Sequence, residues 1–341
     1  MTETIPLNQR IQAPDAPIPA SGNGITWRPA SIDDIDAIMV CERAMNAVDH
    51  PHYVTNREEL EEDFTSSWVD MAADSVLALE DSGEVVAWGF VTVSQGQETA
   101  VRVILLGGVR PDRRGEGLGR ALLDWQEARS RQLLAASDKP LPGVLVLWAD
   151  ERAESTIRLS RRFGFDIARY YLELRRDLAE PIAAARPLEG YQLVQFDASR
   201  SEDARLARND AFRDHWGSQP VVEEAWASFL GRSIFRPDLS FLAVSPDGEV
   251  AGFVLSEVDE EDFEPQGFSS AYIDLVGVRR DHRGKGIAAA LLTRALEAIR
   301  DAGLQKAVLD VDSESLTGAT RLYENVGFTH GNRSVDLRKS F

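Results

Sequence analysis

The stretch from 278 to 292, VRRDHRGKGIAAALL, contains the residue types of an anion-binding turn. Residues 279–285 have a net charge of +3 although the whole chain is acidic. Gly284 and Gly286 allow the backbone to approach a ligand closely. If a helix begins directly after Gly286, the free NH groups of its first turn and its dipole favour an anion there. We call residues 279–286 the second basic turn, because a similar turn occurs earlier in the chain. We interpret it as a pyrophosphate site.

The same pattern occurs 169 positions earlier, where residues 109–123 read VRPDRRGEGLGRALL. Ten of the sixteen residues in 108–123 are identical to their counterparts in 277–292, which indicates an internal repeat. We call residues 110–117 the first basic turn. Its residues 110–116 have a net charge of only +1. We therefore expect the second basic turn to bind an anion more tightly than the first.

Each basic turn must be held between a strand and a helix. Apolar runs over 101–109 and 272–278 predict the strands, and helical periodicity follows each turn. Downstream, LSRRFGF at 159–165 matches LYENVGF at 322–328. The repeated order of elements predicts two α/β domains. The predicted divisions are a disordered lead-in over 1–24, a first domain over 25–178, a linker over 179–190 and a second domain over 191–341.

Composition excludes several classes of protein. A chain of 341 residues with 43% hydrophobic residues is typical of a globular protein with more than one domain, and no apolar run approaches the length of about 20 residues that spans a membrane. The net charge of -19 argues against nucleic acid as a partner. The single cysteine, Cys41, lies in an apolar periodic segment and is interpreted as a buried structural thiol. The first residues lack the pattern of a secretory signal, so we expect a cytoplasmic protein.

The two turns, RGEGLG at 114–119 and RGKGIA at 283–288, resemble the signature of the GCN5-related N-acetyltransferase (GNAT) superfamily. In that family an Arg/Gln-x-x-Gly-x-Gly/Ala turn joins a strand to a helix, and a Gly-Phe pair follows later. Both copies match, and the resemblance spans nearly the whole chain after residue 24. Neither turn continues as a P-loop, and no dinucleotide-binding glycine motif follows an early strand. Kinases and dehydrogenases are therefore excluded.

The resemblance implies two tandem GNAT domains. Each would be a twisted mixed β-sheet flanked by helices and splayed between its fourth and fifth strands, with acetyl-CoA in the gap and no metal. Ser315 stands where the family often has Asn. The residues implied to bind acetyl-CoA are Val276, Gly277, Val278, Arg283, Gly284, Lys285, Gly286, Ile287, Ala288 and Ser315 in the second domain, and Gly107, Gly108, Val109, Arg114, Gly115, Gly117 and Gly119 in the first.

Acetyl transfer to an amine needs a proton donor for the departing thiolate and an acceptor for the proton of the amine. Tyr323 matches the family tyrosine that lies near the sulfur, so we predict that it is the general acid; a packing tyrosine is the alternative. Asp274 lies on the predicted fourth strand, two and four residues before Val276 and Val278, so strict alternation places all three side chains on the same face of the sheet. Tyr272 would share that face. We predict that Asp274 receives the amine proton through a water molecule. Its alternative is a structural carboxylate.

The first copy has Ser160 at the position of Tyr323 and Leu105 at that of Asp274. We therefore expect the first domain to bind without catalysing. The residues predicted to bind the acceptor are His215, Trp216 and Tyr272. By the resemblance, His215 and Trp216 lie at the acceptor wall, although an aromatic core contact is equally consistent with them. The expected acceptor is the primary amine of a small molecule, and the paired domains favour a monomer. A protein that binds acetyl-CoA for regulation, without turnover, is the competing hypothesis.

Overall fold

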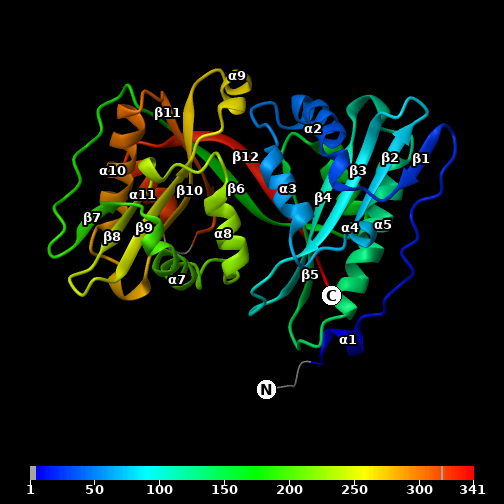
Figure 1. The fold of residues 1–341 in the computed structure, drawn as a ribbon, viewed down its shortest axis with the longest axis horizontal. Helices are drawn as coiled ribbons and strands as arrows, with labels where there is room; N and C mark the ends of the chain where they lie inside the picture. The colour runs from blue at the N-terminus through cyan, green and yellow to red at the C-terminus, as the bar shows by residue number, and fades with distance from the viewer. Residues whose placement is uncertain (1–4, 316–317) are drawn as a thin grey trace. The chain divides into compact units, whose positions relative to one another are not determined.

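The computed structural model describes residues 5–315 and 318–341 and divides them into two compact units (Figure 1). Unit 1 holds the described residues up to Arg169 together with Val335–Phe341, and unit 2 holds those from Tyr170 to Ser334. Each unit is a mixed sheet with helices on both faces. The α/β class predicted from the repeated order of elements is confirmed.

The sheet of unit 1 has the strand order β1-β2-β3-β4-β5. All of its neighbouring pairs are antiparallel except β4 and β5, which are parallel. The elements are α1 (Leu7–Arg10), β1 (Ile25–Arg28), η1 (Ile32–Asp34), α2 (Ile35–Asp49), α3 (Arg57–Thr65), α4 (Met71–Asp74), β2 (Ser75–Glu80), β3 (Val85–Val93), β4 (Val101–Val109), η2 (Pro111–Arg113), α5 (Leu118–Ala135), β5 (Gly143–Asp150) and α6 (Glu154–Arg162).

Alternation along the strands of unit 1 gives each sheet face its own core. Leu77 packs with apolar residues of α2 and α3, whereas its neighbours Val76 and Ala78 pack against α5. Cys41 of α2 is buried in the first of these clusters, and burial raises the pKa of its thiol to about 12. The interpretation of Cys41 as a structural residue is therefore confirmed by its position.

The sheet of unit 2 has the strand order β7-β8-β9-β10-β11-β6. Strands β10 and β11 are parallel, and the other neighbouring pairs are antiparallel. The elements that lie wholly or partly in unit 2 are β6 (Asp166–Asp177), β7 (Gln192–Gln195), η3 (Ala198–Arg200), α7 (Ser201–Ala211), α8 (Glu223–Gly231), η4 (Pro237–Leu239), β8 (Phe241–Val244), β9 (Val250–Glu257), η5 (Glu260–Asp262), α9 (Phe263–Gln266), β10 (Ser270–Val278), η6 (Arg280–His282), α10 (Ile287–Asp301), β11 (Lys306–Asp312), α11 (Ala319–Asn325) and β12 (Thr329–Ser340). Of these, β6 begins and β12 ends in unit 1.

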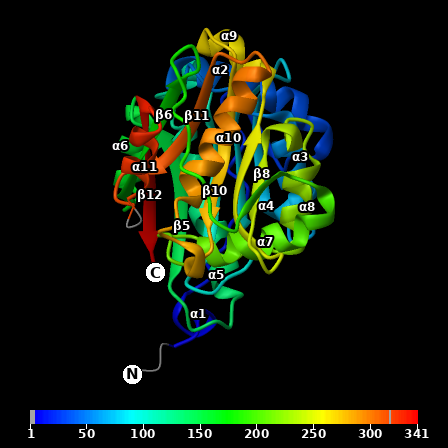
Figure 2. The ribbon, with the colours of Figure 1, turned by 90° about the vertical axis from the view of Figure 1, so that its left-hand side faces the viewer.

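Two helix pairs cover opposite faces of this sheet. Phe253 and Leu255 of β9 pack with α7 and α8, whereas Ala251 and Val254 pack with α10. Figure 2 shows α10 lying along its face of the sheet with α11 beside it. We call the two sides of the sheet the α7/α8 face and the α10/α11 face. The distinction matters because the candidate site residues divide between them.

The predicted splay is present in both units. In unit 1, β4 and β5 pair only from Val101 to Ile104 on β4, and in unit 2, β10 and β11 pair only from Ser270 to Tyr272 on β10. Beyond these residues the facing backbone edges of the two parallel strands are not bonded to each other. Each basic turn follows directly after the unpaired end of its strand. The splay of the fourth and fifth strands therefore leads toward the predicted pyrophosphate site.

The partners of the last strands differ from the prediction. The sequence assigns Tyr170–Leu174 to the first domain, but this part of β6 pairs antiparallel with β11 in unit 2. Conversely, the end of the chain belongs to unit 1, where Phe341 and Gly143 exchange two backbone hydrogen bonds. The physical reason is that an alternating apolar pattern predicts a strand but not the strand with which it pairs. The structural boundary therefore lies at Arg169 and Tyr170, before the predicted linker.

Leu174 of β6 provides a test of this strand assignment. It is fully buried in the core of unit 2. We expect Leu174→Ala to lower the free energy of unfolding by about 2–5 kcal/mol because it leaves a cavity. Hydrogen exchange measured by mass spectrometry should then show lost protection in β11 and α10. Leu206→Ala is the matched control, since Leu206 is 45% exposed on α7. Lost protection confined to unit 1 would contradict the assignment.

The lead-in predicted to be disordered is partly ordered. Leu7 is fully buried, and its Cδ2 lies 3.1 Å from the place where a Cβ on Gly143 would be. Arg10 donates to the carbonyl oxygen of Phe341 at 2.8 Å. The burial of Leu7 and the hydrogen bond from Arg10 to Phe341 hold this short helix, which local composition does not predict. Among the described residues, no helix has both the length and the apolar character needed to cross a membrane.

Candidate active site

The second basic turn has the backbone form that its glycines predict. Gly284 and Gly286 have φ of +77° and +82°, in the left-handed region, and Gly286 caps α10 at its N-terminus. A Cβ added to Gly284 would meet no heavy atom within 4 Å. The turn therefore leaves open space in front of backbone NH groups at a helix N-terminus, which fits a pyrophosphate group. Gly115 and Gly117 of the first basic turn adopt the same conformation.

The two arginines that begin the glycine motifs point back into the protein. Arg283 donates from Nε to the carbonyl oxygen of Val278 at 3.3 Å and from Nη1 to Asp214 at 3.2 Å. Arg114 makes the same pair of contacts in unit 1, to the carbonyl oxygen of Val109 at 3.1 Å and to Asp49. Both side chains therefore brace their turns, so a phosphate would meet the backbone NH groups of the turn rather than these two arginines.

Lys285 takes part in a short polar chain. Its Nζ lies 2.8 Å from the hydroxyl of Tyr191 and 5.4 Å from the centre of that ring. The same hydroxyl lies 2.8 Å from Nδ1 of His282, whose Nε2 is 3.5 Å from Glu249. The ammonium of Lys285 is thus held beside the glycines by a neutral partner, and its charge remains for an anion.

The first basic turn is neutralised from within unit 1. Arg110 forms ion pairs with Glu80 at 2.7 Å and with Glu84 at 3.0 Å. Arg113 forms ion pairs with Glu80 at 2.6 Å and with Glu116 at 2.9 Å. These carboxylates occupy the cations that an anion would need. The arginines of the second basic turn are paired too, Arg279 with Glu249 at 2.9 Å and Arg280 and Arg283 with Asp214 at 3.1 and 3.2 Å. The difference that favours unit 2 as the stronger anion site is Lys285, which stands where unit 1 has Glu116.

The remaining residues predicted to bind acetyl-CoA lie on the strand before each basic turn, in the helix after it, or beyond the end of β11. Gly277 admits no side chain, since a Cβ there would lie 2.4 Å from the ring of Phe253. The side chains of Val276 and Val278 pack into the core on the α10/α11 face, so they can offer only backbone. Ile287 is buried, Ala288 is half-buried, and Ser315 lies beyond the end of β11. In unit 1, Gly107, Gly108, Val109 and Gly119 hold the corresponding positions, with Gly107 at φ +109°.

Strand β10 contains a β-bulge at Asp274. Ile273 is opposite Ser256 and Leu275 is opposite Leu255, which leaves Asp274 as the extra residue. Strand β4 pairs with β3 without such an interruption over Val103–Val109. Asp274 is exposed. The pairing of β10 with β9 therefore contains a bulge that the pairing of β4 with β3 does not have. The comparison of the two repeats did not predict this difference.

The bulge also overturns the expected facing of β10. The prediction placed Tyr272 on the same face as Val276 and Val278. Because one residue is inserted, Leu275 packs on the α7/α8 face while Val276 packs on the α10/α11 face, with Ile273. Tyr272, which alternates with Ile273, therefore lies on the α7/α8 face, opposite the side chains of Val276 and Val278. The single face predicted from strict alternation is wrong, since alternation fails at a bulge.

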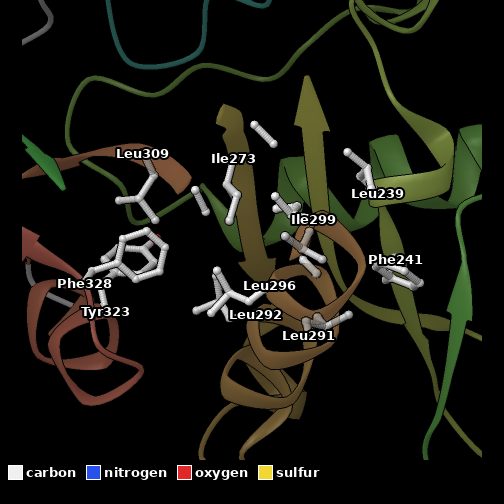
Figure 3. Close-up of a cluster of buried hydrophobic side chains, with 14 of the residues drawn as sticks. Leu239, Phe241, Ile273, Leu291, Leu292, Leu296, Ile299, Leu309, Tyr323 and Phe328 are labelled. Atoms are coloured by element: carbon white, nitrogen blue, oxygen red, sulfur yellow. The ribbon is translucent and has the colours of Figure 1, made fainter. Parts of the chain in front are cut away.

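Tyr323 lies in the core of the α10/α11 face. Its ring contacts that of Phe328 edge to face, with centroids 5.8 Å apart, and Figure 3 shows the two side by side near Leu309. The side chain is 8% exposed, and burial raises the pKa of its phenol to about 12. Tyr323 therefore keeps its proton across the physiological range, as a general acid must. Its packing role, which the sequence left as an alternative, is also present.

The structure adds Asp310, which the sequence analysis did not select. The hydroxyl of Tyr272 donates to Oδ2 of Asp310 at 3.0 Å, from β10 to β11 beside the splay. Desolvation by the surrounding protein raises the pKa of Asp310 to about 6, against the effect of the hydrogen bond from Tyr272. A carboxylate inside the apolar run AVLDV was the signal in the sequence, because the first copy has Leu147 there.

His215 and Trp216 follow α7, the helix that packs on the α7/α8 face of the sheet. His215 is half-buried against Phe212, with ring centroids 5.5 Å apart. Burial lowers the pKa of His215, while the charge of Asp312 on β11 raises it. The structure thus brings His215 within electrostatic range of β11, on the side where Tyr272 and Asp310 lie. Trp216, the next residue, is half-buried.

At the corresponding positions unit 1 has other chemistry. Ser160 is buried, and its hydroxyl donates to the carbonyl oxygen of Thr156 at 2.9 Å in the same helix. Leu105 is buried. At the end of β5, Arg152 turns back to Asp150 at 2.9 Å. These contacts are those of a packed fold, and they support the expectation that unit 1 lacks the proton-transfer groups.

A left-handed glycine turn at a helix N-terminus, reached along two splayed parallel strands, defines the class of transferases that use acyl-CoA. Residues 202–328 match the model of the acetyltransferase (GNAT) family. The chain is 34% identical over 241 residues to a mycothiol acetyltransferase from Thermobispora bispora, an alignment that covers 68% of this chain and 74% of that protein. The chain therefore belongs to the GNAT family of acetyltransferases. It is an acyltransferase, and its cosubstrate is acetyl-CoA.

Solved structures agree with this assignment. A GCN5-related N-acetyltransferase from Sphaerobacter thermophilus is 26% identical and superposes with a TM-score of 0.70, covering 94% of this chain and 97% of that one. A tandem GNAT protein from the clavulanic acid biosynthesis pathway is 16% identical, with a TM-score of 0.64 and coverage of 93% and 98%. The second likeness is one of fold alone. It shows that two GNAT units occur in one chain elsewhere.

Proposed function

We propose that unit 2 transfers the acetyl group of acetyl-CoA directly to the primary amine of a small molecule. The observation that carries the proposal is the division of the site between the two sheet faces. Tyr323 lies on the α10/α11 face, while Tyr272 and Asp310 lie on the α7/α8 face beside the splay. Acetyl-CoA and the acceptor can then approach the gap from opposite sides. Unit 1 has the splay and the turn but apolar or internally bonded residues at these positions.

Each residue has a role in this proposal. Backbone NH groups of Gly284, Lys285 and Gly286 hold the pyrophosphate, and the charge of Lys285 assists them. Backbone of Val276–Val278 orients the thioester arm, and an NH group there polarises its carbonyl. Asp274, exposed at the bulge, takes the proton that turns an incoming ammonium into a nucleophilic amine, through a water molecule. Tyr323 donates a proton to the sulfur as the C–S bond breaks.

A narrower version of the proposal concerns the acceptor. Several relatives named mycothiol acetyltransferase are 30–34% identical to this chain over about 70% of its length. Their name favours mycothiol synthesis, the acetylation of a cysteinyl-glucosaminyl-inositol amine, as the particular reaction. Other small primary amines remain alternatives within the same proposal. We further propose that the protein acts as a monomer in the cytoplasm, with no nucleic acid or membrane partner.

The experiment that tests the function is thiol release from acetyl-CoA in the presence of a panel of amines. The panel should contain a cysteinyl-glucosaminyl-inositol, an aminoglycoside, a polyamine and a peptide with a free N-terminus. We expect release of CoA that depends on one class of amine, together with the acetylated product in the mass spectrum. Binding of acetyl-CoA without turnover on any amine would favour the regulatory alternative.

A further inference from the structure

The pair formed by Tyr272 and Asp310 stands at the point where β10 and β11 separate. Tyr272 is opposite Val308 in the last paired position of β10, and Asp310 is two residues further along β11. The phenol crosses from one strand to the other and donates to the carboxylate at 3.0 Å. Tyr272 is half-buried and Asp310 has solvent-exposed surface, so both can be reached, although the protein atoms packed around them desolvate both groups. An acceptor entering the gap from the α7/α8 face would meet the phenol oxygen.

The repeat supplies an internal control for this pair. Val103 is opposite Leu145 in β4 and β5, as Tyr272 is opposite Val308 in β10 and β11. The counterparts of Tyr272 and Asp310 are therefore Val103 and Leu147, which are 0% and 7% exposed. The same strand geometry thus forms with two apolar side chains. The polar pair is not required by the fold, and it occurs in the copy that has Tyr323.

Two protons must leave an ammonium before it becomes an amide nitrogen. One departs when the ammonium becomes an amine, and the second departs as the C–N bond forms. We propose that the second proton passes to the phenol oxygen of Tyr272 while the phenol proton passes to Asp310. The C–S electrons leave with sulfur, which takes its proton from Tyr323, so charges and atoms balance. This inference rests on the function proposed above, and it deepens it by naming the group that receives the second proton.

The charges around Asp310 favour this direction of transfer. From β10 it faces Tyr272, and Asp274 is near enough to act on the same phenol. From β6 it is opposite Glu173, which is paired with Arg175, and its own strand contributes Asp312. Desolvation and the charge of Glu173 raise the pKa of Asp310 to about 6, so it is ionised at neutral pH and still a better base than an ordinary carboxylate.

The test compares Asp310→Asn, Tyr272→Phe and the double variant with the wild type. The acceptor should be a weakly basic amine that is uncharged throughout the pH range, so that its own titration does not appear. We expect each single variant to lower kcat by about 10²-fold, with the KM for acetyl-CoA unchanged. The double variant should be no slower than the singles, because the two residues act as one path. The wild-type kcat should fall below pH 6, and this acid limb should be absent in Asp310→Asn.

Stability provides a second readout, since a structural role would move it the other way. The pKa of Asp310 is raised from 3.8 to about 6 on folding, so protonation favours the fold. This contribution is fully present below pH 3.8 and is lost as the pH rises through 6. Asp310→Asn should therefore have a higher Tm than the wild type at pH 8 and an equal one near pH 3.8. Tyr272→Val with Asp310→Leu, which copies unit 1, should also fold.

Three outcomes would overturn the inference. In the first, Asp310→Asn keeps the wild-type kcat and acid limb. In the second, Asp274→Asn and not Asp310→Asn removes the limb, which would give the second proton to Asp274. In the third, Asp310→Asn loses activity only in parallel with a lower Tm at pH 8. Absence of turnover by the wild type on every amine would instead overturn the proposed function, and this inference with it.

Discussion

Replacing Tyr323 by phenylalanine is expected to lower kcat by about 10²-fold or more while the KM for acetyl-CoA changes little. The phenol is the donor proposed for the departing thiolate, and its pKa of about 12 keeps it protonated over any practical assay range. Phenylalanine preserves the ring that packs against Phe328, so the core of the α10/α11 face should remain intact. The measurement is steady-state CoA release together with a thermal unfolding curve.

The control for this variant is Ser160→Ala at the corresponding position of unit 1. It should leave kcat unchanged, because the Ser160 hydroxyl bonds only within its own helix among the contacts of the described residues. A basic limb in the wild-type pH profile near or below neutrality would not belong to Tyr323, given its raised pKa. If Tyr323→Phe retains wild-type kcat, Tyr323 is a packing residue and the proton donor lies elsewhere.

The second large effect is expected from Gly284→Ala in the second basic turn. A side chain at φ +77° costs about 1–2 kcal/mol, and the methyl group enters the open space assigned to the pyrophosphate. The empty turn of the variant can relax out of this conformation, so that binding must restore the strain; together with a lost phosphate contact of about 1 kcal/mol, this should weaken acetyl-CoA binding by roughly 30-fold or more. Isothermal titration calorimetry gives the affinity, and the KM for acetyl-CoA should rise in parallel.

Gly115→Ala is the matched variant in unit 1. Gly115 has φ +87° and the same open space, so the backbone strain is equal. We expect no change in affinity or KM, and a stoichiometry of one acetyl-CoA per wild-type chain, because the first basic turn has Glu116, paired with Arg113, where the second has Lys285. A stoichiometry of two that Gly115→Ala reduces to one would show that unit 1 also binds the cosubstrate.

Much of the architecture could be predicted from local patterns. The glycines of both basic turns were recognisable because their left-handed conformation needs glycine, and the helices after them because apolar residues recur with helical spacing. The splay followed from the family resemblance. By contrast, the buried helix at Leu7–Arg10 depends on one leucine and one arginine that find distant partners. No local pattern contains those partners.

The candidate site divides in the same way. The positions of Tyr323 and of the glycines were predictable, because motif and repeat place them by spacing alone. The bulge at Asp274 was not, because an inserted residue becomes visible only when the pairing with β9 is known. Its consequence is that Tyr272 turns to the α7/α8 face and meets Asp310. Asp310 was missed because its proposed role depends on the hydrogen bond from Tyr272, which is 38 residues away in the sequence.

By itself the sequence determined that the chain holds two copies of a basic glycine turn, and that only the second copy has a tyrosine and an aspartate at the positions for which we propose roles in acetyl transfer. These are matters of residue type and spacing, which local backbone chemistry governs. The tertiary structure decided which strand completes each sheet, which face each polar side chain occupies and which carboxylate meets Tyr272. Those outcomes depend on register and pairing between distant segments, and hydrogen bonds between strands select them only once the whole sheet has formed.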